Sequence, residues 1–273
     1  MSALHYRAVF LSDIHLGTKD THCEDLLDFL QQVQCDQLYL LGDVIDIWKA
    51  KSGWHWPMHS HNVMHRILDK ASRGTKVSYI PGNHDEALRA YANTVFEGVN
   101  IVMEAEHQTA DGKRLLLIHG DEFDNAVRHS QLLHALGSHA YDLLLVLNRW
   151  QNHWRRRMGM SHWSLAGFIK QHARQARQHI ESYERAAVHE AKRRGYDGIV
   201  CGHIHQAADK VIDGIRYLNT GDWVENCTAI AEDFSGKLHL ICWPRQREGL
   251  MHAGSLPESG AEMVAEAIED LAA

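Results

Sequence analysis

The heptapeptide QLYLLGD (Gln37–Asp43) joins a short apolar run to a glycine and an aspartate. A run of this length that ends in glycine is typical of a buried strand. Before it, CEDLLDFLQQV (Cys23–Val33) has apolar residues at helical spacing, and YRAVFLSD (Tyr6–Asp13) has the pattern of a first strand. After it, a predicted helix over residues 59–73 leads to KVSYIPGNHD (Lys76–Asp85), a third strand with a Pro-Gly stop. This alternation predicts an α/β fold with parallel strand pairs.

The second half of the chain contains a long helical segment between further strands. NIVMEAEHQTADGKRLLLIHGD predicts strands around an Asp111-Gly112 turn, the last of them ending at His119. Residues 124–194 carry no strand signal and are expected to be largely helical, with Gly195 as the stop. The remaining predicted elements are a strand at GIVCGH (Gly198–His203), hairpins turning at Asp213-Gly214 and Ser235-Gly236, and a short acidic helix over 257–271. We therefore expect a core of residues 1–123 and 196–243, a helical insertion of 124–195 and a tail of 244–273.

The length of 273 residues fits one large domain, or one domain with an inserted subdomain. Of 273 residues, 45% are apolar and 23% charged, as in ordinary soluble proteins. Five cysteines without a C-x-x-C pattern argue against a disulfide framework and for a reducing compartment. The sequence shows neither a secretory signal pattern nor an apolar run near the ~18 residues of a membrane span, so a cytoplasmic location is expected.

Charge is distributed unevenly along the chain. The net charge of −7 disfavours general nucleic-acid binding. The segment Arg149–Arg194, however, has eleven basic residues against three acidic ones. A basic segment in an acidic protein indicates an anionic partner for that segment, or else a solvated helical face.

Side chains that can bind metal ions follow the predicted strands. The carboxyl ends of strands in an open α/β sheet line one crevice, so we expect these side chains to converge. In GHIH, residues i and i+2 of an extended segment would point the same way and carry both imidazoles into one small volume. The candidates are Asp13, His15, Asp43, Asp46, Asn83, His84, Asp85, His119, His203 and His205.

Mixed carboxylate, imidazole and amide ligands suit Mn²⁺, Fe²⁺ or Zn²⁺, without a preference for thiolate. One carboxylate can bridge two ions about 3.5–4 Å apart, and a hydroxide shared by such ions is a strong nucleophile at neutral pH. A lone D-x-H or GD occurs often by chance. Five such motifs, each after a predicted strand, do not, and they predict a site with two divalent cations.

The ordered set D-x-H, G-D-x-x-D, G-N-H-D, H and G-H-x-H resembles the signature of the calcineurin-like metallophosphoesterase superfamily. The resemblance implies a four-layer α/β/β/α sandwich, with a helical insertion in this chain. It implies one ion held by Asp13, His15, Asp43 and His205, and a second held by Asp43, Asn83, His119 and His203. It places His84 near the leaving group as general acid or hydrogen-bond donor, with Asp85 orienting it and Asp46 supporting a metal ligand.

Longer stretches resemble one branch of that superfamily, the UDP-2,3-diacylglucosamine pyrophosphohydrolases of lipid A biosynthesis. They are FLSDIHLG, LYLLGDVIDIW, a helical insertion after HGDEFD, and GHIHQA with YLNTGDWVENCTAI. The resemblance implies cleavage of a lipid-linked sugar nucleotide to UMP and 2,3-diacylglucosamine 1-phosphate, with manganese, at the cytoplasmic face of the inner membrane. The best-known branch has Arg after the Asn of the third motif, whereas this chain has His84, the general residue of the superfamily.

The helical insertion contains the features that an acyl-sugar nucleotide would need. Apolar stretches could contact acyl chains, and basic side chains could contact phosphate or an anionic membrane surface. Leu and Trp at helical spacing are equally typical of a helical hairpin that packs on its own domain. The candidate substrate-binding residues are Arg149, Arg155, Arg156, Arg157, Trp163 and Lys170.

Two other functions fit parts of the pattern. The first is a phosphodiesterase or phosphatase that acts on soluble nucleotides or phosphoproteins, with the insertion as a generic cap. The second is a scaffold that keeps the fold without the chemistry, against which the complete ligand set argues.

Overall fold

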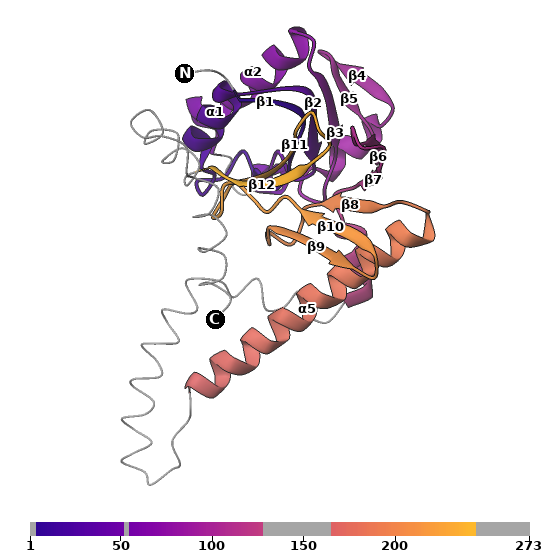
Figure 1. The fold of residues 1–273 in the computed structure, drawn as a ribbon. Helices are drawn as coiled ribbons and strands as arrows, with labels where there is room; N and C mark the ends of the chain where they lie inside the picture. The colour runs from indigo at the N-terminus through magenta and orange to yellow at the C-terminus, as the bar shows by residue number, and fades with distance from the viewer. Residues whose placement is uncertain (1–3, 52–54, 128–164, 244–273) are drawn as a thin grey trace, which may run out of the picture.

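The computed structural model describes residues 4–51, 55–127 and 165–243 and contains two β-sheets (Figure 1). The larger sheet has seven strands in the order β12-β11-β1-β2-β3-β5-β4. Strands β1, β2, β3 and β5 are parallel neighbours, as the β-α-β pattern of the sequence predicts. The strands are β1 (Leu4–Leu11), β2 (Val33–Leu41), β3 (Lys76–Ile80), β4 (Thr94–Phe96), β5 (Val99–Ile101), β11 (Thr228–Glu232) and β12 (Leu238–Cys242).

The smaller sheet has five strands in the order β6-β7-β8-β10-β9, with β7, β8 and β10 parallel. The predicted hairpin between β9 and β10 is confirmed, and both turn residues, Asp213 (φ 50°) and Gly214 (φ 83°), are left-handed. Two left-handed turn residues match the right-handed twist of the flanking strands. The predicted hairpin at Ser235-Gly236 is also confirmed. The strands are β6 (Ala105–Gln108), β7 (Arg114–Leu117), β8 (Gly198–Cys201), β9 (Ala208–Ile212) and β10 (Ile215–Asn219).

Successive side chains of a strand point to opposite faces of its sheet and pack into different hydrophobic cores. In β1, Phe10 packs into a core between the two sheets, whereas Leu11 packs into the core on the outer face of the larger sheet. In β8, Val200 joins the core between the sheets, whereas Ile199 joins a third core on the outer face of the smaller sheet. This period of two is what a strand buried on both faces requires.

Helices cover both outer faces. Helices α1 (Cys23–Gln32) and α2 (Met58–Ser72) pack on the larger sheet, and α5 (Leu165–Arg193) packs on the smaller one (Figure 1). The resulting order is helix, sheet, sheet, helix, so the four-layer α/β/β/α sandwich that the family resemblance implies is confirmed. Three 3₁₀ helices complete the described elements: η1 (Ile47–Lys51), η2 (Glu86–Tyr91) and η3 (Asp121–Val127).

Helix α5 supplies the described part of the predicted helical segment. It ends where expected, because Gly195 adopts a left-handed φ of 75° and its N–H bonds the Lys192 carbonyl. Residues 128–164 and 244–273 lie outside the described ranges, so the limits of the insertion and the tail stay predictions. Within the described ranges, no helix is both long enough and apolar enough to cross a bilayer.

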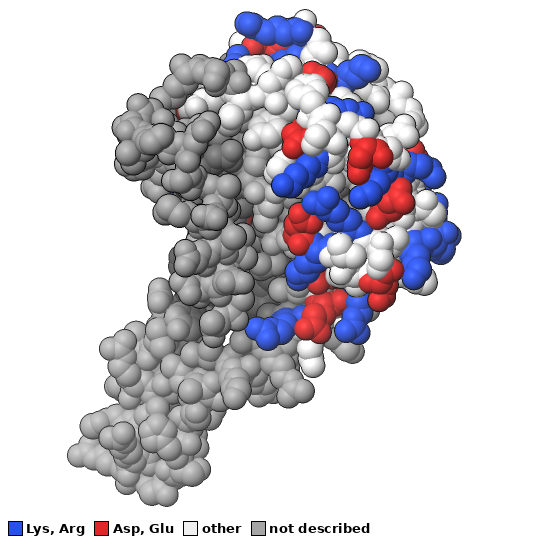
Figure 2. Space-filling model, viewed as in Figure 1, with Lys and Arg blue, Asp and Glu red and all other residues white. Residues whose placement is uncertain are grey.

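Basic and acidic side chains are interspersed on the face shown in Figure 2. At the described end of the basic segment, Arg193 pairs with Glu190 on its own helix, and Arg194 pairs with Glu104. These basic residues are therefore already neutralised by acidic neighbours. The basic residues of this segment that precede residue 165 lie outside the described part of the chain.

Candidate metal centre

The carboxyl ends of strands from both sheets meet at one edge of the sandwich. The loops after β1, β2 and β3 come from the larger sheet, and those after β7 and β8 come from the smaller one. Backbone hydrogen bonds join them: Asp13 N–H donates to Gly42 O at 3.0 Å and His15 N–H to Asp43 O at 2.8 Å. Within the smaller sheet, Gly202 N–H donates to His119 O at 3.0 Å, and between the two sheets His203 N–H donates to Asp13 Oδ2 at 2.9 Å. The convergence predicted from the strand ends is therefore present.

The loops reach this convergence with left-handed backbone conformations, whereas the sequence predicted an extended backbone for GHIH. Five site residues are left-handed instead of extended: Asp13 (φ 51°), His15 (54°), Asp43 (53°), His203 (70°) and His205 (55°). Such a conformation costs of order 1 kcal/mol for a residue with a side chain and gathers at functional sites. The prediction that GHIH carries both rings into one volume by extended geometry is corrected, since the two rings reach adjacent clusters.

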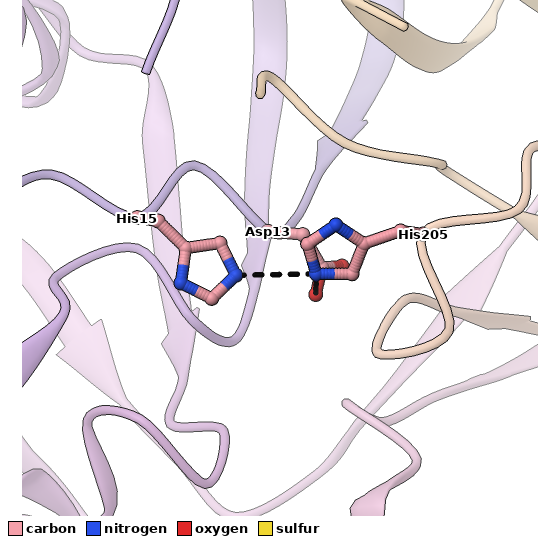
Figure 3. A group of neighbouring side chains, drawn as sticks. All are labelled: Asp13, His15 and His205. Atoms are coloured by element: carbon pink, nitrogen blue, oxygen red, sulfur yellow. Dashed lines mark hydrogen bonds and ion pairs between the residues drawn. The ribbon is translucent and has the colours of Figure 1, made fainter. Parts of the chain in front are cut away.

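The first cluster consists of Asp13, His15 and His205 (Figure 3). The Nε2 atoms of His15 and His205 are 3.2 Å apart, and His205 Nε2 lies 3.3 Å from Asp13 Oδ1. Separations of this size are expected between ligands that share one ion with bonds near 2.0–2.2 Å. Asp13 Oδ2 accepts the His203 N–H at 2.9 Å and the Ser12 hydroxyl, which leaves Oδ1 facing the imidazoles.

The second cluster consists of Asp43, His119 and His203, with Asn83 beside it. His119 Nδ1 lies 2.8 Å from the Leu41 carbonyl, to which it can only donate a hydrogen bond. Nε2 is therefore the His119 nitrogen that is available to bind a metal ion. That nitrogen lies 3.4 Å from Asp43 Oδ2 and 3.2 Å from Asn83 Oδ1. His203 Nε2 lies 2.8 Å from Asp124 Oδ2.

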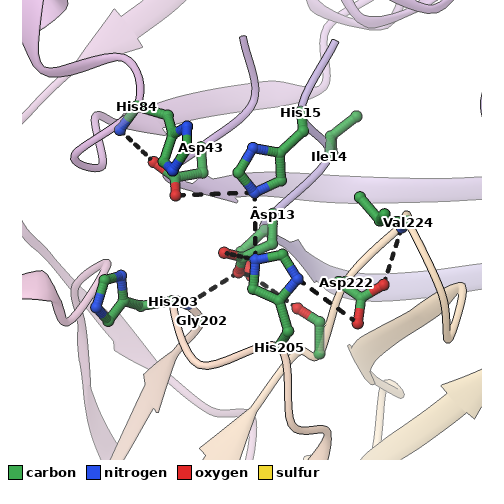
Figure 4. A network of polar contacts seen from close by, with 12 residues as sticks. Asp13, Ile14, His15, Asp43, His84, Gly202, His203, His205, Asp222 and Val224 are labelled. Carbon is green, nitrogen blue, oxygen red and sulfur yellow. Dashed lines mark hydrogen bonds and ion pairs between the residues drawn. The ribbon is translucent and has the colours of Figure 1, made fainter. Parts of the chain in front are cut away.

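Asp43 approaches both clusters. Figure 4 shows its carboxylate beside the His15 ring and the backbone of His84. Its Oδ1 accepts the His84 backbone N–H at 2.8 Å. Its Oδ2 lies 3.4 Å from His119 Nε2 and 3.9 Å from His15 Nε2, one nitrogen of each cluster. A single oxygen that faces both clusters has the placement of a bridging ligand.

Burial and charge make the site suitable for cations. Within the described residues, Asp13 Oδ1 is a buried oxygen without a hydrogen-bond partner, which is costly unless a cation satisfies it. Burial alone would raise the pKa of Asp13, but His205 and His119 outweigh burial and lower it. Burial would likewise lower the pKa of His119, yet the Asp43 carboxylate outweighs it and raises that pKa to about 10. The carboxylates therefore create a strong demand for positive charge, and the residues present fit divalent ions.

His84 lies at the edge of both clusters. Its Nδ1 is 3.2 Å from Asp46 Oδ2, and its ring meets the His15 ring edge to face at 4.6 Å. Burial would lower the pKa of His84, but the bond to Asp46 and the charge of Asp43 outweigh it and raise this pKa. The ring therefore holds a proton more firmly than an ordinary histidine does.

Two glycines are required by close packing against the ligands. A Cβ on Gly82 would collide with Asp43 Oδ1, and a Cβ on Gly202 would collide with Asp13 Oδ2 and the Ser12 side chain. The glycines of the G-N-H-D and G-H-x-H motifs therefore let one loop approach the carboxylate of another.

Residues 6–207 match the calcineurin-like phosphoesterase family, which is well over half of the chain. The chain belongs to the calcineurin-like phosphoesterase family. The resemblance predicted from the motifs is confirmed by this match, and the matched residues include every residue of both clusters.

The two relatives described next are both UDP-2,3-diacylglucosamine hydrolases. The UDP-2,3-diacylglucosamine hydrolase of Histophilus somni is 29% identical over 119 residues, which cover 42% of this chain and 49% of that protein. The chain thus spans about half the length of such relatives. The protein of the same name from Psychromonas ingrahamii is 24% identical over 253 residues, covering 87% of this chain and 98% of that one. Among solved structures, a hypothetical protein from Pyrococcus horikoshii has a TM-score of 0.47 at 11% identity, covering 93% of this chain and 95% of that one.

The phosphoesterase site differs from the sequence expectation in its supporting residues. Asp46, expected only to support a ligand, contacts both His15 and His84. Asp85, expected to orient His84, instead accepts the backbone N–H groups of Gly82 (2.6 Å) and Val44 (2.8 Å) and the Tyr79 hydroxyl (2.5 Å). Asp85 therefore fixes the loops that carry the ligands.

Three supporting residues of the phosphoesterase were missed in the sequence. They are Ser12, which bonds Asp13; Asp124, which bonds His203; and Asp222, whose Oδ2 lies 4.0 Å from His205 Nδ1. Ser12 and Asp124 adjoin predicted motifs, but only the fold shows their partners. Of the candidate substrate residues, Arg149, Arg155, Arg156, Arg157 and Trp163 lie outside the described residues, and the side chain of Lys170 does too.

Replacing Asp85 with alanine is expected to destabilise the phosphoesterase. The change leaves at least two buried N–H groups without an acceptor, each at a cost of about 1–3 kcal/mol. The free energy of unfolding should fall by about 3 kcal/mol or more, measured by urea denaturation. Asp36→Ala is the matched control, because that side chain is 54% exposed on strand β2. An unchanged midpoint for Asp85→Ala would contradict the structural role.

Proposed function

We propose that this chain is a hydrolase that cleaves a phosphoric anhydride or ester with two divalent cations. The observation that carries the proposal is the position of Asp43 Oδ2 between one histidine nitrogen of each cluster. One ion would be held by Asp13, His15, Asp43 and His205, and the other by Asp43, Asn83, His119 and His203. Mn²⁺ is the proposed metal, ahead of Fe²⁺ and Zn²⁺.

When bound, two cations would supply an activated water nucleophile and neutralise charge on the phosphoryl oxygens. The chain's own residues orient the reaction around them. Asp43 fixes the spacing of the two ligand clusters, and Asp46 holds His84 through its Nδ1. His84 Nε2 is then free to donate a hydrogen bond or a proton to the leaving oxygen. His84 is accordingly the proposed catalytic residue, and Asp46 takes the orienting role expected of Asp85.

We propose UDP-2,3-diacylglucosamine as the substrate, cleaved to UMP and 2,3-diacylglucosamine 1-phosphate. Two relatives named UDP-2,3-diacylglucosamine hydrolase support this substrate, and one of them aligns with 87% of this chain. The helical insertion would contribute Arg149, Arg155, Arg156, Arg157, Trp163 and Lys170 to phosphate and acyl recognition. Binding at the inner face of the cytoplasmic membrane would bring the site to a lipid-linked substrate.

A comparison of substrates tests this assignment. With Mn²⁺ added, we expect kcat/KM for UDP-2,3-diacylglucosamine to exceed that for soluble nucleotides, phosphopeptides and a chromogenic phosphodiester. The expected factor is about 100 or more, which corresponds to ~3 kcal/mol of additional binding to the transition state. Reaction of the soluble esters alone would establish the broader phosphodiesterase function instead. Less than one metal ion per chain and no turnover of any ester would indicate a scaffold.

A further inference from the structure

Trp48 covers one face of the His84 ring. It lies in the short helix η1, two residues after Asp46. The ring centroids of Trp48 and His84 are 4.2 Å apart, with an interplanar angle of 32°. The two rings are tilted but in contact, and their separation is the shortest among the aromatic contacts of the described residues.

The remaining contacts of His84 leave one atom of its ring free. Asp46 Oδ2 lies 3.2 Å from Nδ1, and the His15 ring meets the His84 ring at 90°. The His84 carbonyl accepts the Ile47 N–H at 3.1 Å, which ties η1 to the G-N-H-D loop. With one face covered by Trp48 and Nδ1 paired, Nε2 is the polar atom left to face a substrate.

Trp48 is poorly placed to stabilise the fold. It is 50% exposed, whereas the fully buried Trp223 and Trp243 pack in the core beneath α1. A large aromatic side chain held at the surface against a polar ring contributes less to burial than a core tryptophan does. Its contact with His84 is the one that bears on the reaction. Asp46 approaches His84 Nδ1 at 3.2 Å as an ion-pair contact without hydrogen-bond geometry, which leaves the imidazole free to rotate.

We infer that Trp48 is a positioning residue, which stacks on His84 and thereby holds its Nε2 toward the leaving oxygen. The inference rests on the proposed function, since it gives His84 the role of donor to the leaving group. A group that must be aligned loses much of its effect when displaced by about 1 Å, by up to 10²-fold. Stacking supplies this alignment without adding a charge to a site already crowded with carboxylates.

Leaving-group dependence tests the inference. A series of aryl and alkyl phosphodiesters would be assayed with wild-type protein, Trp48→Ala, Trp48→Phe and His84→Ala. Trp48→Ala is expected to lose about 10- to 100-fold in kcat on esters with poor leaving groups and little on nitrophenyl esters, because only poor leaving groups need a donor. Trp48→Phe should restore most of the rate, and KM should stay within about twofold throughout, since the outer face of Trp48 is not assigned a substrate contact.

Controls separate this inference from the proposed function. Adding Trp48→Ala to His84→Ala should cost nothing further, because the two residues act as one unit. Phe96→Ala, which removes a 63% exposed aromatic on edge strand β4, should change no rate. Metal content and thermal midpoint should match wild type in Trp48→Ala.

Several outcomes would overturn the inference. A uniform loss across all leaving groups, a raised KM with kcat unchanged, or full additivity with His84→Ala would each show that Trp48 does not act through His84. If His84→Ala itself shows no leaving-group dependence, the proposed role of His84 fails, and the inference fails with it. If kcat depends on the leaving group in His84→Ala but not in Trp48→Ala, the inference about Trp48 fails while the proposed role of His84 stands.

Discussion

Asp43→Ala should purify with less than half of the wild-type metal and lose phosphoesterase activity by on the order of 10³-fold or more. Its Oδ2 lies 3.4 Å from His119 Nε2 and 3.9 Å from His15 Nε2, so its loss removes one ligand from each proposed ion. A metal clamp contributes several kcal/mol to phosphoryl transfer, and each 1.36 kcal/mol is a factor of ten in rate. Metal per chain would be measured by elemental analysis after dialysis against metal-free buffer.

Asp36→Ala removes one carboxylate from strand β2, which precedes the loop that carries Asp43, and it should keep full metal and activity. Adding Mn²⁺ at high concentration should restore only a small part of the rate to Asp43→Ala, because geometry as well as affinity is lost. Two ions retained in Asp43→Ala would exclude the bridging role.

His84→Ala is expected to keep both ions and lose about 10²–10⁴-fold in kcat, the range for removal of an acid–base group. Its imidazole pairs with Asp46 at 3.2 Å, and the residue reaches Asp43 only through its backbone N–H, which alanine retains. The ligand clusters should therefore stay intact. Steady-state kinetics and metal analysis on the same preparation would separate the two effects.

A histidine away from the site provides the control for this change. His65→Ala removes an exposed imidazole from helix α2 and should leave kcat unchanged. A loss of metal from His84→Ala that parallels its loss of rate would assign His84 to the coordination shell instead of to the leaving group.

The strands were predictable wherever burial imposes a pattern. QLYLLGD is buried on both sides, and its apolar run predicted β2 directly. The hairpin of β4 and β5 was missed because β4 has three residues, all exposed, and no alternation marks it. Its turn at Glu97-Gly98 adopts left-handed conformations, which only the glycine could have indicated.

The positions of the candidate ligand side chains could be predicted from the strand ends, whereas the residues that support them could not. Asp85 adjoins His84 in the sequence, and adjacency suggested an orienting role. In the fold its carboxylate instead faces the Tyr79 hydroxyl and N–H groups of two loops. The left-handed backbone of Asp13 and His15 could not be predicted either, because tertiary hydrogen bonds impose it against local preference.

The candidate metal centre takes its residues from both sheets, so the catalytic rate should depend on how the two sheets are positioned relative to each other. Asp13 and Asp43 follow strands of one sheet, and His119 and His205 follow strands of the other. Between the sheets lies a layer of tightly packed apolar side chains, among them Phe10. Overpacking that layer by a methylene or two would spread the ligand cage before it unfolds the chain. Damage far from any cation would then appear first as a slower enzyme and only later as a less stable one.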